Sequence, residues 1–298
     1  MLRGAVVTLL ATVALGVPTA AHARPDITGE PLRAATTAAA LAPGGLPAEP
    51  GGHRLPRAAA VAPARHPAVP VTVMSFNVCG GVCRHGEVDR TAAGIVRTAV
   101  RGRASVVLLQ ELCHAQYVRV RHRLPGWSGR FAAQARTRHC GRDRRFGVAL
   151  LTRGALTGAT VRHLPTAAGA ERRVLLGATA TVGGRRTFVA VVHLSPSPAE
   201  GLAGQLAAVA AYLRPRARRP LIAGGDFNAV PGNPGLAPLH AALTELDPAA
   251  TPTFRPHRRK IDYVFVSDGW FRRPRASVVA TTLSDHRVYL GMADLAGG

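Results

Sequence analysis

The sequence is poor in aromatic residues, in acidic residues and in lysine. Aromatic side chains make up 5% of the 298 residues, and 38 basic residues, of which Lys260 alone is a lysine, face 16 acidic ones. So few rings give little sign of stacking platforms for unpaired bases. The formal charge of +22 favours anionic partners, such as nucleic acid or an acidic lipid surface. Arginine amid abundant alanine, glycine and proline is also typical of a GC-rich genome, so the charge supports such a partner without proving it.

Long apolar runs are missing as well. The uncharged stretch 4–17 is shorter than the roughly 20 residues of a membrane span. A basic start precedes it and Ala21-His22-Ala23 follows it, which is typical of a secretory signal peptide cut after Ala23. Residues 24–68 are rich in Ala, Pro and Arg without periodicity, which predicts a disordered spacer. We therefore expect a secreted, extracellular protein with a signal peptide over 1–23 and one folded domain over 69–298.

Cysteine is scarce but even in number. An oxidising compartment would join the four cysteines into two disulfides, for which three pairings are possible. We favour Cys79–Cys83, which closes a short Gly-Gly-Val loop, together with Cys113–Cys140. A zinc site that uses Cys79, Cys83 and a nearby histidine is the alternative.

Apolar runs of strand length alternate with a few helical patterns over the rest of the chain. Such a mixture predicts a mixed α/β architecture in layers. We expect 261–266 and 276–283 to pair as a hairpin. The predicted strands are 71–77, 105–110, 146–152, 160–163, 174–182, 187–194, 220–224, 261–266, 276–283 and 288–293, and the predicted helices are 89–100, 114–123, 199–213 and 236–246.

Polar side chains gather at the ends of these strands. In Gly225-Asp226-Phe227-Asn228, Asp226 and Asn228 are two residues apart and so face one side of an extended chain. In open α/β sheets, sites commonly lie at such an edge, and the expected hairpin would add Asp262 to it. The groups that this edge would collect are Asn77, Glu111, His193, Asp226, Asn228, Asp262, Asp285 and His286.

Six short motifs in order carry a resemblance to a known family. The chain resembles the endonuclease/exonuclease/phosphatase superfamily, the deoxyribonuclease I-like metal-dependent phosphoesterases, and looks like a secreted bacterial type. The resemblance implies a four-layer α/β/β/α sandwich of two packed mixed β-sheets with helices outside, and a hydrolase that uses Mg²⁺ or Mn²⁺. The motifs are Met74–Val78, Gln110–Glu111, Val192–Leu194, Gly225–Asn228, Ile261–Tyr263 and Ser284–His286.

The chemistry of phosphodiester hydrolysis gives these residues roles. Hard divalent cations take oxygen ligands, and the resemblance makes Glu111 the chief ligand, with Asn77 and Asp285 beside it. His286, oriented by Asp262, would be the base that prepares the attacking water. The other three would position the nucleophile and the phosphate or donate to its oxygens: Asp226, Asn228 and His193. The matching histidine of the family has a carboxylate partner, which the sequence does not reveal for His193.

The expected positions of the arginines along the predicted strands favour a polynucleotide substrate. We expect contacts to phosphate from Arg145, Arg258, Arg259 and Lys260 at the site edge, whereas Arg214–Arg219 and Arg272–Arg275 lie at the far edge. The prediction is a DNase I-like endonuclease that acts as a monomer without a protein partner. A sphingomyelinase-like phosphodiesterase is the main alternative, with Trp270-Phe271 at a hairpin tip as its contact to an anionic membrane surface. An inositol or sugar phosphate phosphatase and an inactive binding module are further alternatives.

Overall fold

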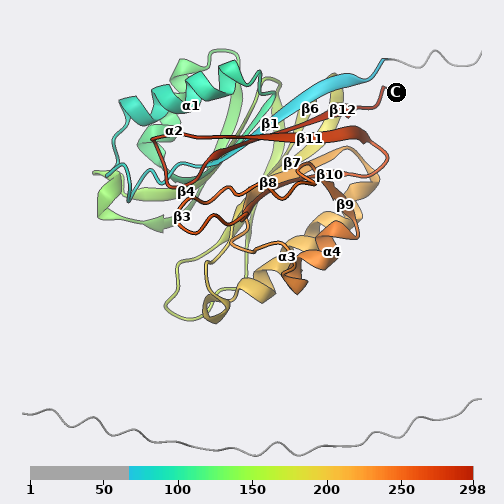
Figure 1. The fold of residues 1–298 in the computed structure, drawn as a ribbon. Coiled ribbons are helices and arrows are strands. Elements are labelled where there is room, and N and C mark those ends of the chain that lie inside the picture. The colour runs from blue at the N-terminus through green and yellow to red at the C-terminus, as the bar shows by residue number, and fades with distance from the viewer. Residues whose placement is uncertain (1–66, 298) are drawn as a thin grey trace, which may run out of the picture. The chain divides into compact units, whose positions relative to one another are not determined.

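The computed structural model describes residues 67–297 (Figure 1). The predicted signal peptide and nearly all of the predicted spacer lie outside the described residues. Strand β1 (Val69–Asn77) begins where the folded domain was expected to begin. Within 67–297, no helix has the length and apolar character needed to cross a bilayer.

The first sheet has six strands in the order β11-β12-β1-β2-β4-β3. Its members are β1, β2 (Val106–Cys113), β3 (Ser128–Arg136), β4 (Arg145–Thr152), β11 (Phe271–Val279) and β12 (Val288–Leu295). Strands β1 and β2 are parallel, and the other neighbours are antiparallel. Helices α1 (Asp89–Arg101) and α2 (His114–Arg123) cover the outer face of this sheet.

The second sheet also has six strands, in the order β5-β6-β7-β8-β10-β9. They are β5 (Leu156–His163), β6 (Val174–Val182), β7 (Arg185–His193), β8 (Leu221–Asp226), β9 (Leu243–Glu245) and β10 (Asp262–Ser267). Only the β7–β8 pair is parallel. Helices α3 (Leu202–Leu213) and α4 (Ala237–His240) cover its outer face. Four short 3₁₀ turns lie at 138–140, 198–200, 214–218 and 234–236.

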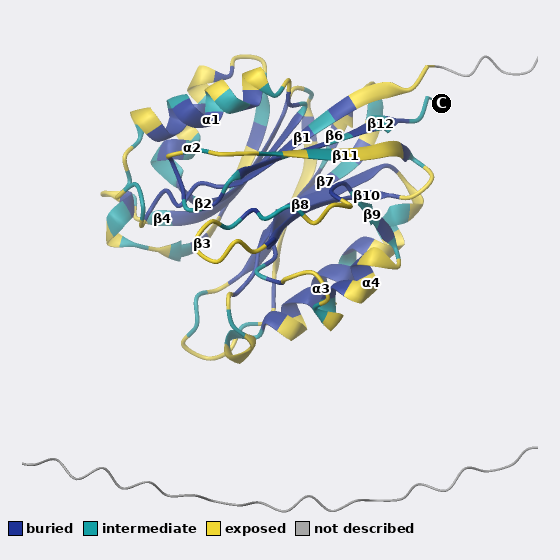
Figure 2. Cartoon of the chain, in the orientation of Figure 1, coloured by how far each residue is buried: buried dark blue, intermediate teal, exposed yellow. Residues whose placement is uncertain are grey.

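Alternation along the strands builds three apolar layers. Val106 and Leu108 of β2 face the second sheet, whereas Val107 and Leu109 face α1, because successive side chains of a strand point to opposite sides. A third apolar layer lies between the second sheet and α3. Figure 2 shows the inner strands of both sheets dark with burial, whereas the edge strand β11 and the outer faces of the helices are exposed. The predicted four-layer sandwich is confirmed.

The two predicted disulfides are confirmed, since Cys79 is bonded to Cys83 and Cys113 to Cys140. The alternative zinc site is wrong, because all four cysteines are paired. Both bridges flank the first sheet near its site edge: Cys79 follows the end of β1 by two residues, and Cys113 ends β2.

Two sequence predictions of secondary structure are wrong, and one strand was missed. The expected helix 236–246 is the one-turn helix α4 followed by the short edge strand β9. The expected hairpin does not form, because β10 pairs with β8 and β9 in the second sheet while β11 pairs with β12 in the first. Strand β3 was not predicted; its sequence, SGRFAAQAR, lacks the apolar run that marks the other strands.

Candidate active site

Three acidic or basic side chains form a row across the second sheet. Neighbouring strands place His193 of β7 beside Asp226 of β8, and Asp226 beside Asp262 of β10. Parallel β7 and β8 end at this edge, whereas antiparallel β10 begins there. Asp262 therefore reaches the site through β8 and not, as the sequence suggested, through a hairpin with β11.

Gly225 lets β7 and β8 approach at the end of the row. Its φ of 143° lies in a region that residues with a side chain rarely adopt, and a Cβ there would overlap the carbonyl of Val192. The next turn places Asn228 at φ 49°, where its backbone N–H donates to Asp226 Oδ1 at 2.9 Å and its side-chain amide donates to Leu194 O at 2.9 Å. The Gly-Asp-Phe-Asn turn thus fixes one oxygen of Asp226 and leaves Oδ2 facing the other groups.

The first sheet contributes Asn77 and Glu111. The amide of Asn77 donates to Glu111 Oε1 at 2.9 Å and to Asp226 Oδ2 at 3.0 Å, and its oxygen accepts from the N–H of Cys79 at 3.0 Å. Asn77 is fully buried and does not line the cavity at this edge, and its amide holds the two carboxylates in place. The direct metal contact expected for Asn77 stays a prediction. Glu111 lies in an irregular part of the β2–β4 pairing with φ 54°, a costly conformation that turns its carboxylate outward.

The segment between β11 and β12 closes the site. Ser284 donates through its hydroxyl to Asn77 O at 2.8 Å, and His286 Nδ1 lies 2.9 Å from Asp262 Oδ2. His286 Nε2 then lies 3.7 Å from Asp226 Oδ2. The ring of Phe254 lies 4.9 Å from that of His286 and lines the same cavity. The sequence analysis missed Phe254, which no motif marked.

Two carboxylates hold His286 in its charged form. Burial alone would lower its pKa, but the negative charges of Asp262 and Asp226 outweigh it and raise the pKa of His286 to about 10. Burial, followed by the nearby charge of Asp262, raises the pKa of Asp226 well above that of an ordinary aspartate, toward neutral pH. These shifts favour the imidazolium form of His286 and make it easier for Asp226 to take up a proton.

His193 has an arginine partner instead of a carboxylate. Arg173, buried just before β6, lies with Nη1 2.9 Å from His193 Nδ1, and it forms a salt bridge of 3.0 Å with Glu171. An arginine can only donate, and Nη1 is closer to Nδ1 than to Nε2, from which it lies 3.4 Å; this favours acceptance by Nδ1 and a ring proton on Nε2. Burial and then the charge of Arg173 hold the pKa of His193 well below its ordinary value. Sequence analysis missed this pair; the one available signal was the charged Glu171-Arg172-Arg173 run directly before a buried strand.

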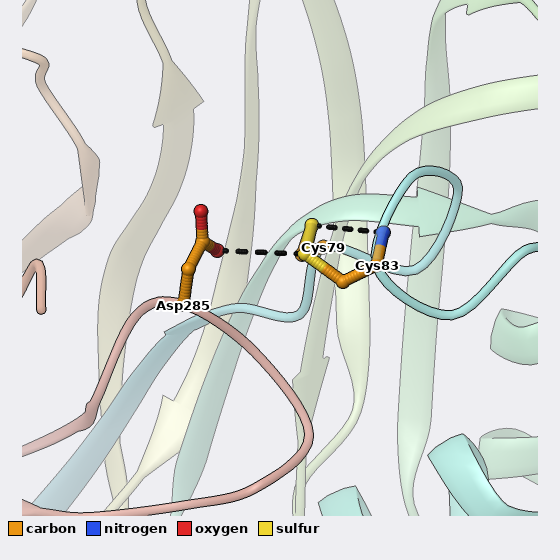
Figure 3. A group of neighbouring side chains, drawn as sticks. All are labelled: Cys79, Cys83 and Asp285. Atoms are coloured by element: carbon orange, nitrogen blue, oxygen red, sulfur yellow. Dashed lines mark hydrogen bonds between the residues drawn. A yellow bond between two sulfur atoms is a disulfide. The ribbon is translucent and has the colours of Figure 1, made fainter. Parts of the chain in front are cut away.

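Glu111 and Asp285 suit a divalent cation. Both line the cavity, and within residues 67–297 neither forms a salt bridge with lysine or arginine. Burial raises the pKa of Glu111, and the charges of Asp285 and Glu171 add to the rise, as expected where carboxylates gather without a cation. Figure 3 shows Asp285 beside the Cys79–Cys83 bridge, with Oδ1 3.8 Å from Cys83 Sγ, which has no hydrogen to donate. A second close group of possible ligands, Asp226, Asp262 and His286, is already engaged by the pairing of His286 with Asp262.

Of the four predicted phosphate contacts, the structure brings Arg259 to the cavity, which has a volume of about 470 Å³. Arg258 is exposed outside it, and Arg145 pairs with Asp143 at 2.5 Å. The expectation for Lys260 is wrong. It is buried, 3.2 Å from both Glu245 and Asp247, and lies between the rings of Tyr263 and Tyr289. Lys260 therefore neutralises buried acids instead of contacting a ligand.

The expected membrane-contact tip is also absent at residues 270–271. Phe271 is buried, and Trp270 packs against the core between the sheets while donating to Arg218 O at 3.2 Å. Arg185 lies over the Trp270 ring, 5.4 Å from its centroid. These aromatic side chains are engaged within the protein and do not project for membrane insertion.

Solved structures share the fold of this chain, and a family profile matches most of its sequence. The structure of an endonuclease/exonuclease/phosphatase from Beutenbergia cavernae is 24% identical over 77% of this chain and 72% of that one, with a TM-score of 0.62. The human Nocturnin catalytic domain with bound sulfate is 20% identical over 76% of this chain and 94% of that one, with a TM-score of 0.62. A mannosyl-6-phosphatase from Bacteroides thetaiotaomicron is 17% identical over 74% and 98%, with a TM-score of 0.62.

No curated protein sequence matches the chain. The profile of the Endonuclease/Exonuclease/phosphatase family matches residues 74–286, a span that runs from the strand leading to Asn77 through His286. Its superfamily comprises phosphoester hydrolases that depend on a divalent metal. The chain belongs to the endonuclease/exonuclease/phosphatase family.

Proposed function

We propose that the protein is a nuclease that hydrolyses the phosphodiester bonds of nucleic acid with the help of Mg²⁺ or Mn²⁺. The observation that carries the proposal is the convergence of two oppositely tuned histidines on Asp226, with His286 Nε2 and His193 Nε2 each 3.7 Å from Asp226 Oδ2. A phosphodiester needs a water that loses a proton and a phosphate whose growing negative charge is offset. This row of residues can supply both.

Glu111 and Asp285 would hold the cation, which when bound would offset negative charge on a phosphate oxygen. His193, with its proton fixed on Nε2 by Arg173, would donate to another oxygen of the phosphate. Asp226 and His286 would act as a pair on the water: Asp226 receives the proton, and the imidazolium offsets the charge. We propose Asp226 as the proton acceptor in place of His286, the base expected from the sequence, because the pKa of Asp226 is raised toward neutral pH and that of His286 is raised to about 10.

Nucleic acid is favoured over a phospholipid by two features. The residues 270–271 that were expected to contact a membrane are packed against the protein. The cavity also opens beside Arg259, and the chain as a whole is strongly basic, as expected for a protein that binds a polyanion. Two disulfides support the further proposal of secretion, which mass spectrometry of exported protein would test by an N-terminus at Arg24.

The test is hydrolysis by the full chain of plasmid DNA, RNA, sphingomyelin and bis(p-nitrophenyl) phosphate, each with Mg²⁺, with Mn²⁺ and with EDTA. A double variant Glu111→Gln, His286→Ala serves as the blank. We expect metal-dependent nicking of the plasmid that EDTA and the double variant abolish. Cleavage of sphingomyelin with the plasmid left intact would overturn the nuclease proposal.

A further inference from the structure

A second cavity lies next to the site, between α1 and the segment that joins β11 to β12. It has a volume of about 780 Å³, with a floor that includes Leu283, Val288 and Leu290. A Cβ at Gly94 would overlap the side chain of Leu283, so this glycine lets α1 lie close to the floor. We call this cavity the α1 groove.

Four arginines surround the α1 groove: Arg90, Arg97, Arg101 and Arg255. The first three are exposed and lie on one face of α1, because residues seven and four apart recur on the same side of a helix. Within the described chain, none of the four forms a salt bridge, and the lining of the groove contains no carboxylate. Asp89, the nearby acid of α1, is engaged by Arg119 and Arg123 instead. The positive charge of the groove is therefore available to a ligand.

The α1 groove adjoins the catalytic cavity at two places along the chain. Arg255 lines the groove and its neighbour Phe254 lines the catalytic cavity; in the same way, Leu283 lines the groove while Asp285 lines the cavity. Arg255 holds these two segments together, since its side chain donates to Ser284 O and its backbone N–H donates to Asp285 O at 3.0 Å. A chain of phosphates that passes His286 can thus extend along α1.

We propose that the α1 groove binds the phosphate backbone of duplex DNA on one side of the bond that is cut. This inference rests on the proposed nuclease function. From Arg90 to Arg101 the helix rises about 16 Å at ~1.5 Å per residue, which matches about five nucleotide steps at ~3.4 Å each. A bilayer is too broad and flat to enter a concave groove of this kind, whereas a nucleic acid backbone can lie along it.

The test compares two triple variants of the full chain. Arg90→Gln, Arg97→Gln, Arg101→Gln removes charge from the groove, and Arg214→Gln, Arg218→Gln, Arg219→Gln removes the same charge from the exposed far edge before β8. Arg255 is left in place because it donates hydrogen bonds to Ser284 O and Asp285 O, in the segment next to His286. The measurements are KM for a DNA duplex as a function of salt, hydrolysis of bis(p-nitrophenyl) phosphate, and binding to phosphatidylserine-containing vesicles.

We expect the groove variant to raise KM for the duplex about tenfold or more near 0.15 M salt, because three phosphate contacts are lost. Its slope of log affinity against log salt should become shallower by up to about 2.7, at ~0.9 per phosphate. Hydrolysis of the small diester should stay within about twofold of the parent, and the far-edge variant should resemble the parent throughout.

Equal effects of the two triple variants on the duplex would overturn the groove proposal and leave the nuclease function standing. Loss of vesicle binding in the groove variant, with duplex cleavage unchanged, would also overturn it and assign the groove to an anionic lipid surface. A parent that hydrolyses the small diester but never DNA would overturn the nuclease function itself. These results are distinguishable because the small diester is too short to reach α1.

Discussion

The site contains two histidines that the protein tunes in opposite directions. His286 and His193 approach Asp226 Oδ2 at the same distance, 3.7 Å, through the same ring nitrogen. Their other nitrogens differ: Nδ1 of His286 faces the carboxylate of Asp262, and Nδ1 of His193 faces the guanidinium of Arg173. The pKa of His286 rises to about 10 and that of His193 falls well below its ordinary value. Burial lowers the pKa of both rings; the carboxylates of Asp262 and Asp226 reverse this effect at His286, whereas the charge of Arg173 adds to it at His193.

The largest effect is expected for the substitution His286→Ala. It removes the cation that offsets the charges of Asp226 and Asp262, so we expect kcat/KM for DNA to fall roughly a hundredfold to ten-thousandfold, the range for acid–base groups. Steady-state kinetics with Mg²⁺ measures the loss. His122→Ala, an exposed site on α2, is the control and should keep full activity. Unchanged kinetics in the His286 variant would remove this residue from the mechanism.

Arg173→Met should lower kcat/KM less than His286→Ala does, and it should change how kcat/KM depends on pH. The variant loses one charged hydrogen bond worth about 1.5–3 kcal/mol, so we expect kcat/KM to drop roughly tenfold to a hundredfold. Without the charge of Arg173 the pKa of His193 rises, so the variant should lose further activity as pH falls, at a higher pH than the parent does.

The pH profile of kcat/KM separates positioning of His193 from a purely structural role of Arg173. Arg173→Lys should restore part of the activity at neutral pH, since an ammonium can still donate to Nδ1. The exposed neighbour offers a matched control, Arg172→Met, which should behave like the parent. A loss that is the same at every pH would mean that Arg173 does not set the protonation of His193.

The mildest test changes no residue: the metal-free parent is titrated with pH while NMR monitors the histidine rings. His286 should stay protonated through neutral pH and titrate near 10, whereas His193 should stay neutral well below pH 6.5. A raised pKa in the folded state means that the contribution of His286 to stability is complete below about pH 6.5 and is lost as pH rises through about 10. Two histidines that titrate together near 6.5 would contradict the comparison.

Sequence predicts the groups of this site that follow apolar strands. His193 and Asp226 end neighbouring strands, so their meeting follows from strand order and the period of a strand. Asp262 was also predicted, but for a wrong reason, because whether β10 pairs with β8 or with β11 depends on packing between sheets that local pattern does not contain.

Partners that come from distant segments could not be predicted in this way. Arg173 lies 20 residues from His193 and meets it only because β6 and β7 pair antiparallel. Lys260 looked like a phosphate contact within a basic run, yet Glu245 and Asp247 bury it. Glu245 ends the edge strand β9, which the sequence pattern predicted as helix, and Asp247 follows two residues later. A charged residue is predicted to be exposed when the sequence does not reveal the partners that bury it.

The position of Asn77 between the two sheets bears on when the site forms during folding. Its amide joins Glu111 of the first sheet to Asp226 of the second, so the expected metal ligand meets the row of polar groups in the second sheet only where the two sheets pack together. A chain in which both sheets have formed but have not yet docked would contain every one of these residues and no working site. Recovery of hydrolysis during refolding therefore marks the final docking of the two halves, rather than the formation of either one.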